Sequence, residues 1–99
     1  MITYSIRARM ARVGPEAATW AHQVADLVTR KTGVPTQVAS RIGGPQDIIW
    51  VTNYEDFGAF EKAQAALQSD QGYLGMLATA EEKHLFDTSS VESAFWQPI

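Results

Sequence analysis

Apolar and polar residues alternate along the first ten positions of the chain. The apolar positions are Ile2, Tyr4, Ile6, Ala8 and Met10, and the polar positions between them are Thr3, Ser5, Arg7 and Arg9. This period of two predicts a strand over residues 2–10 with one buried face and one polar face. Arg7 and Arg9 would share the polar face.

A helical period follows this strand. The positions of its apolar stripe are Ala17, Trp20, Ala21, Val24, Leu27 and Val28. Gly14-Pro15-Glu16 predicts the start of the helix, because proline and an acidic residue favour the first turn. Gly33 predicts its end, and Pro35 prevents it from continuing.

Two short runs rich in β-branched residues predict the second and third strands, at 36–42 and 48–52. Gly43-Gly44-Pro45 lies between them and is typical of a turn. The two strands should therefore form a hairpin. Trp50 lies in the third strand, and the apolar pattern leaves open which face of the sheet carries it.

Two more helices are predicted after the hairpin. Asn53 is the expected N-terminal cap of the first helix, with Asp56 three positions later in a box-like arrangement. Ser69-Asp70 is the expected cap of the second helix. The apolar face of the first helix is predicted to contain Phe57, Phe60, Ala63, Gln64 and Leu67. That of the second is predicted to contain Tyr73, Leu74, Leu77, Ala80 and, if the helix extends so far, His84.

A polar break is expected over residues 87–90, and a final strand over 91–97. Polarity does not decide which sheet face carries Trp96. The order of elements is then β-α-β-β-α-(α)-β, an α+β, ferredoxin-like pattern. It predicts an antiparallel four-stranded sheet with helices on one face and nothing from the chain on the other.

Composition limits the possible functions. The 99 residues, with net charge -3, are expected to form a single domain over 1–99. The acidic balance predicts no nucleic-acid or membrane partner, and no apolar block resembles a signal peptide, so a cytoplasmic location is expected. The absence of cysteine excludes disulfides and cysteine-based metal sites.

Several short segments carry a resemblance to a known group of proteins. These are Trp50 with Tyr54-Glu55-Asp56, Phe60-Glu61-Lys62-Ala63, Ser69-Asp70-Gln71-Gly72-Tyr73 and Phe95-Trp96. In these segments the chain resembles the dimeric α+β barrel superfamily and, within it, the small NIPSNAP-like proteins. The resemblance implies a homodimer in which two sheets pack face to face, with the helices outside. It also implies a ligand cavity between sheet and helices.

Members of that superfamily include cofactor-free oxygenases, haem binders and lactone isomerases, so the fold does not select a reaction. The asparagine, tryptophan and histidine set of the antibiotic-type monooxygenases is not recognisable here. The only asparagine is Asn53, which is expected to cap a helix. This difference argues against an oxygenase.

The candidate site residues come from three kinds of side chain. His84 is the candidate general base, because imidazole titrates near neutral pH. Arg7 and Arg9 are candidates for holding a carboxylate or enolate, although pairing with acids such as Glu92 is the simpler explanation. Candidates for an aromatic pocket include Trp50, Tyr73 and Trp96, although they are more simply core or dimer contacts.

These observations lead to three hypotheses. The first is a NIPSNAP-like dimeric barrel that binds a small aromatic or anionic molecule between sheet and helices. The second is a cofactor-independent monooxygenase or isomerase that uses His84 as its base. The third is a structural homodimer without an active site. No metal, phosphate-loop or cofactor motif is present, so no cofactor is expected.

Overall fold

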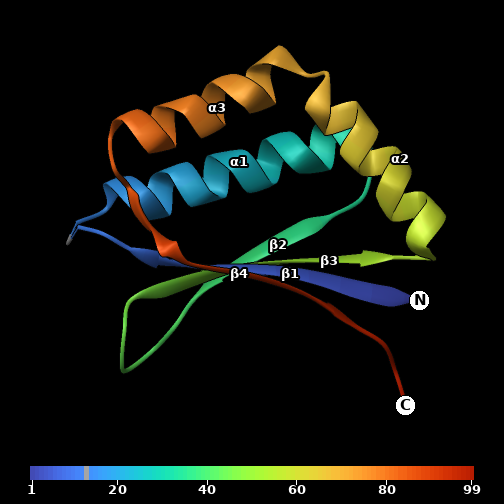
Figure 1. The fold of residues 1–99 in the computed structure, drawn as a ribbon, viewed down its shortest axis with the longest axis horizontal. Coiled ribbons are helices and arrows are strands. Elements are labelled where there is room, and N and C mark those ends of the chain that lie inside the picture. The colour runs from blue at the N-terminus through green and yellow to red at the C-terminus, as the bar shows by residue number, and fades with distance from the viewer. Residues whose placement is uncertain (13) are drawn as a thin grey trace.

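A computed structural model describes residues 1–12 and 14–99, and its elements follow the predicted order β-α-β-β-α-α-β (Figure 1). They are β1 (Ile2–Met10), α1 (Glu16–Thr32), β2 (Thr36–Ser40), β3 (Asp47–Tyr54), α2 (Phe57–Gln68), α3 (Gln71–Glu82) and β4 (Phe86–Trp96). The strands form one antiparallel sheet in the order β2-β3-β1-β4. The ferredoxin-like α+β prediction is therefore confirmed.

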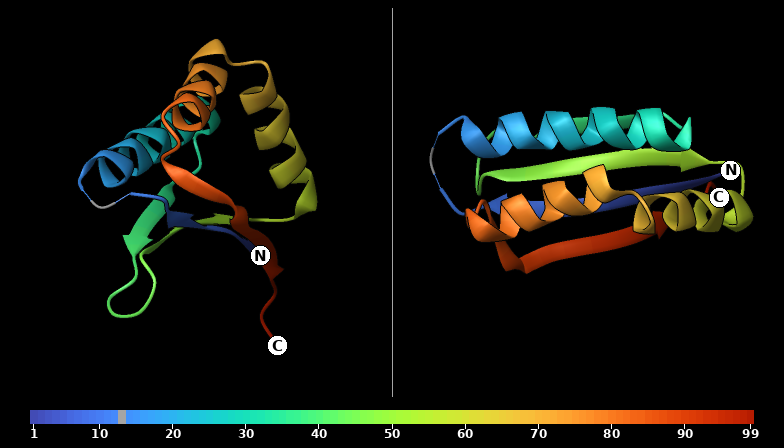
Figure 2. Two further views of the ribbon diagram at one scale, coloured as in Figure 1. Left: turned by 60° about the vertical axis from the view of Figure 1, so that its left-hand side comes forward. Right: turned by 90° about the horizontal axis from the view of Figure 1, so that it is seen from above.

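All three helices lie on the same side of the sheet, and its other face is left open (Figures 1 and 2). The loop between β2 and β3 and the C-terminal end of the chain both extend away from the helices, on the side of the open face (Figure 1). No helix in the described part of the chain is long and apolar enough to cross a membrane.

The register of the strands decides the orientation of the tryptophans. Ile6 lies opposite Trp50, and both line the space under the helices. Thr3 lies opposite Trp96, one position out of phase with Tyr4 and Ile6, so Trp96 lies on the open face. Trp50 is thus a helix-side residue, and Trp96 is 61% exposed.

Two tryptophan indoles join the helices to one another and to the sheet. The indole N–H of Trp50 donates to the carbonyl of Ala21 in α1 over 3.1 Å. That of Trp20 donates to the carbonyl of Met76 in α3 over 2.9 Å. Each ring therefore buries apolar area while its one polar group stays hydrogen-bonded, which avoids the cost of an orphaned donor.

The boundaries of β3 and α2 correct the predicted helix cap. Asn53 is not a cap: it lies within β3 on the open face, where its Oδ1 accepts from Thr3 Oγ1 at 2.6 Å. Asp56 caps α2 instead, and its Oδ1 accepts from the amide of Ala59 at 2.8 Å. A polar residue on the uncovered side of a strand had resembled a cap in the sequence. The cap predicted at Asp70 is confirmed, because its Oδ2 accepts from the amide of Tyr73.

The second and last strands also differ from their predicted lengths. β2 ends at Ser40 rather than Ile42. β4 begins at Phe86, so the expected polar break lies inside it. The polar run interrupts the regular pairing of β4 with β1, because the register shifts between Arg7 and Arg9. There the amide of Arg9 donates to Ser90 Oγ at 2.8 Å. Polar residues suit this edge strand because one of its sides is open to solvent.

Candidate functional site

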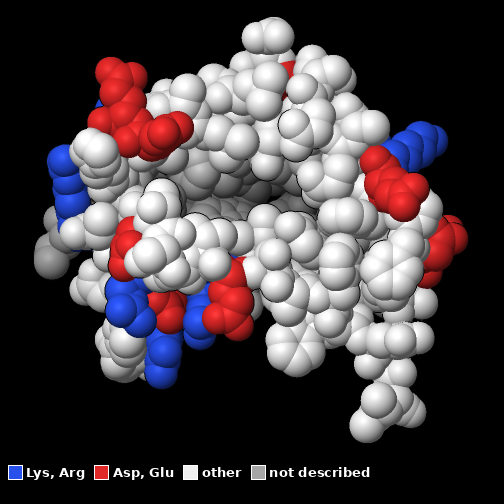
Figure 3. All heavy atoms as spheres, in the orientation of Figure 1, with Lys and Arg blue, Asp and Glu red and all other residues white. Residues whose placement is uncertain are grey.

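A cavity of about 540 Å³ lies between the sheet and the three helices. It is visible as a hollow between the helices and the sheet in the space-filling view (Figure 3). The sheet contributes Tyr4, Ile6, Trp50 and Thr52, and the helices contribute Trp20, Val24, Gln64, Leu67, Tyr73 and Leu77. The cavity exists because α3 packs mainly against α1 and α2 rather than against the sheet.

The exposed members of the lining mark the mouth of the cavity. On the helix side they are Leu77, Glu81 and His84, and on β4 they are Thr88 and Val91. Lining residues farther in, such as Ala8 and Val24, are buried. The cavity therefore opens between the C-terminal half of α3 and the edge strand.

Aromatic rings form much of the interior and hold one another in place. The ring centroids of Trp20 and Trp50 lie 6.1 Å apart with their planes perpendicular. Phe86 completes this group at 5.4 Å from Trp20 and 5.7 Å from Trp50. Edge-to-face contacts of this kind stabilise a fixed arrangement, so this wall is pre-formed.

Two tyrosines of the cavity, Tyr54 and Tyr73, are neutral. Burial raises the pKa of Tyr73 above its ordinary value, and burial likewise raises the pKa of Tyr54. Because both pKa values move away from physiological pH, the phenols keep their protons. They supply hydroxyl groups rather than phenolate charges.

The lining contains little charge. Among the described residues that line it, Glu81 is the only acid and His84 the only imidazole, and none is a lysine or arginine. A carboxylate or phosphate in this cavity would therefore have no lysine or arginine as a partner.

His84 has an unusual backbone conformation at the mouth. Its φ of 51° makes it the only described residue other than glycine with a positive φ. The helix does not reach His84, since α3 ends at Glu82. Non-glycine residues in the left-handed region store strain, and such strain is concentrated at functional sites.

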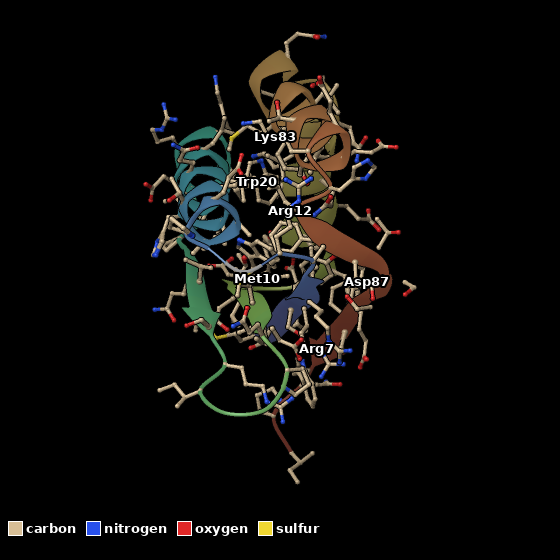
Figure 4. The ribbon with its side chains drawn as sticks, turned by 90° about the vertical axis from the view of Figure 1, so that its left-hand side faces the viewer. Arg7, Met10, Arg12, Trp20, Lys83 and Asp87 are labelled. Carbon is tan, nitrogen blue, oxygen red and sulfur yellow. The ribbon has the colours of Figure 1, made fainter. Side chains whose placement is uncertain are left out.

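The structure separates the candidate site residues into two groups. Trp50, Tyr73 and His84 all line the cavity. Arg7, Arg9 and Trp96 do not: they lie on the opposite face of the sheet, as the side chain of Arg7 in Figure 4 illustrates. The strand register therefore places the two arginines and Trp96 away from the cavity, on the polar face that the alternation of β1 predicts for the arginines.

The two arginines have carboxylate partners on the open face. Arg7 Nη2 lies 2.8 Å from Glu92 Oε2, and Arg9 Nε lies 3.5 Å from Asp47 Oδ1. Arg41 and Arg7 also approach Asp47, at 3.6 and 3.9 Å. Trp96 donates its indole N–H to Ser5 Oγ at 2.9 Å. The arginines thus form an ion-pair cluster.

Glu81, Thr88 and Val91 also line the cavity, although the sequence had not indicated them as site residues. Glu81 lies three positions before His84 and four after Leu77, so helical spacing was a usable signal. Thr88 and Val91 gave no such signal, because the irregular part of β4 breaks the alternation of faces. Within residues 1–12 and 14–99, no group of three or more His, Cys, Asp or Glu side chains is placed to hold a metal ion.

No protein-family model matches the sequence, and a comparison with curated proteins finds no match. Solved structures do match. A NIPSNAP domain protein from Burkholderia xenovorans has a TM-score of 0.78 at 15% identity, covering 100% of this chain and 95% of its own. A NIPSNAP family protein from Agrobacterium tumefaciens has a TM-score of 0.77 at 16% identity, with 99% and 92% covered.

Another match is SnoaB, a cofactor-independent oxygenase from Streptomyces nogalater. Its TM-score is 0.71 at 17% identity, and the match covers 99% of this chain and 92% of that one. Identities this low carry the fold and not the activity. The chain therefore has the ferredoxin-like α+β fold that NIPSNAP-domain proteins share with SnoaB.

Proposed function

We propose that the cavity between the sheet and the helices binds a small, largely apolar organic molecule with an aromatic ring. The observation that carries this proposal is the open cavity of about 540 Å³ in a chain of 99 residues. Ligand sites of roughly 300–1,000 Å³ with apolar walls and a few polar groups are typical of proteins. A domain that needed only a core would close this space, because empty apolar volume destabilises a fold.

The second part of the proposal is a NIPSNAP-like homodimer formed through the open sheet face. Ile49 and Val51 alternate with the helix-side residues of β3 and therefore belong to that face, which no helix covers (Figure 2). Trp96 lies on the same side. A second copy of the chain would bury these apolar groups, and the resemblance to dimeric barrels supports a second copy as the partner of this face.

A pair of tryptophan variants on α3 tests the binding site. Leu77→Trp enlarges a side chain at the mouth, whereas Ala78→Trp enlarges an exposed neighbour that does not line the cavity. Naphthol, a neutral probe of suitable size, is titrated calorimetrically into each protein. We expect Leu77→Trp to weaken binding about tenfold or more and Ala78→Trp to leave it unchanged. No binding to the wild type, or equal loss in both variants, would refute the site.

A second candidate function is proton abstraction by His84. It is favoured by the position of His84, which is the only imidazole among the described residues that line the cavity and lies at its mouth. A neutral imidazole would accept a proton from an acidic C–H group of the bound molecule. The imidazolium would exchange that proton with solvent and then return a proton to the same carbon.

Deuterium exchange tests this role without knowledge of the natural substrate. The acidic C–H protons of beta-tetralone exchange in D2O, and proton NMR follows their loss with and without the protein. We expect wild-type protein to accelerate the exchange and His84→Gln to lower that acceleration about a hundredfold. Equal rates in both proteins would eliminate His84 as a base, while calorimetry with the same ketone would report whether binding persists.

A further inference from the structure

We infer that the cavity selects organic cations: an arylalkylammonium ion would place its ring among the aromatic side chains and its charged nitrogen at the mouth, beside Glu81. This inference rests on the proposed binding function and adds the charge class of the ligand. It follows from the distribution of charged and aromatic groups around the cavity.

Glu81 is an uncompensated negative charge at the mouth. It forms no ion pair with the residues that the structure describes. The basic residue nearest to it in sequence, Lys83, pairs with Glu16 instead, at 3.0 Å. Three of the arginines are clustered around Asp47 on the far face of the sheet. A cationic group arriving at the mouth therefore meets an acid without a competing partner.

The aromatic interior suits the ring of the same ligand. Aromatic rings gain edge-to-face and offset contacts with one another beyond the area that they bury. Trp20, Trp50 and Phe86 are fixed against one another in the wall, and Tyr73 lies on the helix side. Rings that are held in place lose little conformational freedom when the ligand binds, which leaves the ammonium group at the mouth beside Glu81.

The same wall offers little to an anion. The indole N–H groups of Trp20 and Trp50 already donate to the carbonyls of Met76 and Ala21. They are not free to bind a carboxylate, and no guanidinium or ammonium group lines the described part of the cavity. An anion would meet hydroxyl and amide donors such as Tyr73 and Gln64, but no lysine or arginine to offset its charge.

Three naphthalene derivatives of nearly equal size separate charge from shape. They are naphthylmethylamine, which is an ammonium ion, naphthylmethanol, which is neutral, and naphthoate, which is an anion. Each is titrated calorimetrically into the full chain at the same pH and ionic strength. We expect the ammonium ion to bind about threefold more tightly than the alcohol, and naphthoate to bind most weakly.

Two single-charge variants locate the source of the preference. Glu81→Gln should remove most of the advantage of the amine over the alcohol. Glu82→Gln removes the same charge from the next residue of α3, which does not line the cavity, and should preserve the advantage. The alcohol serves as an internal measure of folding, because its affinity should be the same in all three proteins.

The possible failures are distinct. If none of the three compounds binds, the proposed binding function and this inference are both wrong. If the alcohol binds but the ammonium ion has no advantage, or naphthoate binds as tightly, binding stands and the selection of cations is wrong. The same conclusion follows if Glu82→Gln lowers the advantage as much as Glu81→Gln does.

Discussion

The amide of Leu85 donates a 3.1 Å hydrogen bond to the carbonyl of Ala80, which closes the C-terminus of α3 and leaves His84 in the left-handed conformation between them. The amide of His84 itself donates to the carbonyl of Glu81 at 3.2 Å. Together these bonds form a Schellman closure, whose left-handed position is usually glycine. The structure thus places an imidazole, and its strain, at the mouth of the cavity.

Replacements of His84 should show this strain directly. His84→Gly and His84→Ala both remove the imidazole, but only glycine adopts a positive φ without steric cost. We expect the glycine variant to be more stable than the alanine variant by about 1 kcal/mol, measured as the free energy of unfolding in urea. At Lys83, where φ is -85°, the alanine variant should instead be more stable than the glycine variant. A more stable alanine variant at 84 would show that the backbone there is not left-handed.

Asp47 should be the most sensitive charged residue of the open face. Its side chain is only 7% exposed, and the guanidinium groups of Arg7, Arg9 and Arg41 lie within 3.9 Å of it. Asp47→Asn leaves these cations without their shared negative charge, and we expect a loss of about 2 kcal/mol in urea unfolding. Glu92→Gln is the control, because that side chain is 68% exposed and should cost less than about 1 kcal/mol. Similar losses of unfolding free energy in both variants would contradict the special role of Asp47.

Lysine in the centre of the open face should prevent self-association. Val51→Lys puts a charge where a second copy would bury apolar area, whereas Ala65→Lys puts it on the exposed side of α2. Sedimentation velocity at micromolar concentration should give twice the chain mass of 10.9 kDa for the wild type and Ala65→Lys, and the chain mass for Val51→Lys. A monomeric wild type would refute the dimer.

The cap of α3 predicts part of the acid sensitivity of the fold. The hydrogen bond from the amide of Tyr73 holds the pKa of Asp70 below its ordinary value, and Lys31 at 3.2 Å acts in the same direction. Since the folded pKa is the lower one, this contribution is present above the unfolded pKa of about 3.9 and is lost as pH falls through the folded value.

Asp70→Asn keeps a side chain that caps helices but removes the titrating group. Between about pH 5 and pH 2 its unfolding free energy should therefore decrease less than that of the wild type. Urea unfolding at a series of pH values measures this difference. Asp87 offers a second test, because hydrogen bonds from Ser89 also hold its pKa below the usual value. Parallel decreases for wild type and Asp70→Asn would rule out this role for Asp70.

Local patterns were sufficient to predict the order of the elements. The alternation from Ile2 to Met10 gave β1 its observed bounds, and Gly33 ends α1 with a φ of 74°, where its amide donates to Thr29. Such signals depend on neighbouring residues along one strand or one helical turn, so they can be read without tertiary contacts. Asn53 was misread because a strand residue on an open face and a helix cap are both polar.

The site required the tertiary structure. Ile48, Ile49, Trp50 and Val51 are all apolar, so alternation could not decide which of them face the helices; pairing of Ile6 with Trp50 decided it. Arg7 and Trp50 could be proposed together from the sequence, but the register places them on opposite faces. The cavity depends on how α3 packs above the sheet. The left-handed backbone of His84 depends on the hydrogen bond between the amide of Leu85 and the carbonyl of Ala80. The sequence by itself determined which segments become strands and helices, because those preferences are local; only long-range packing decided which side chains meet.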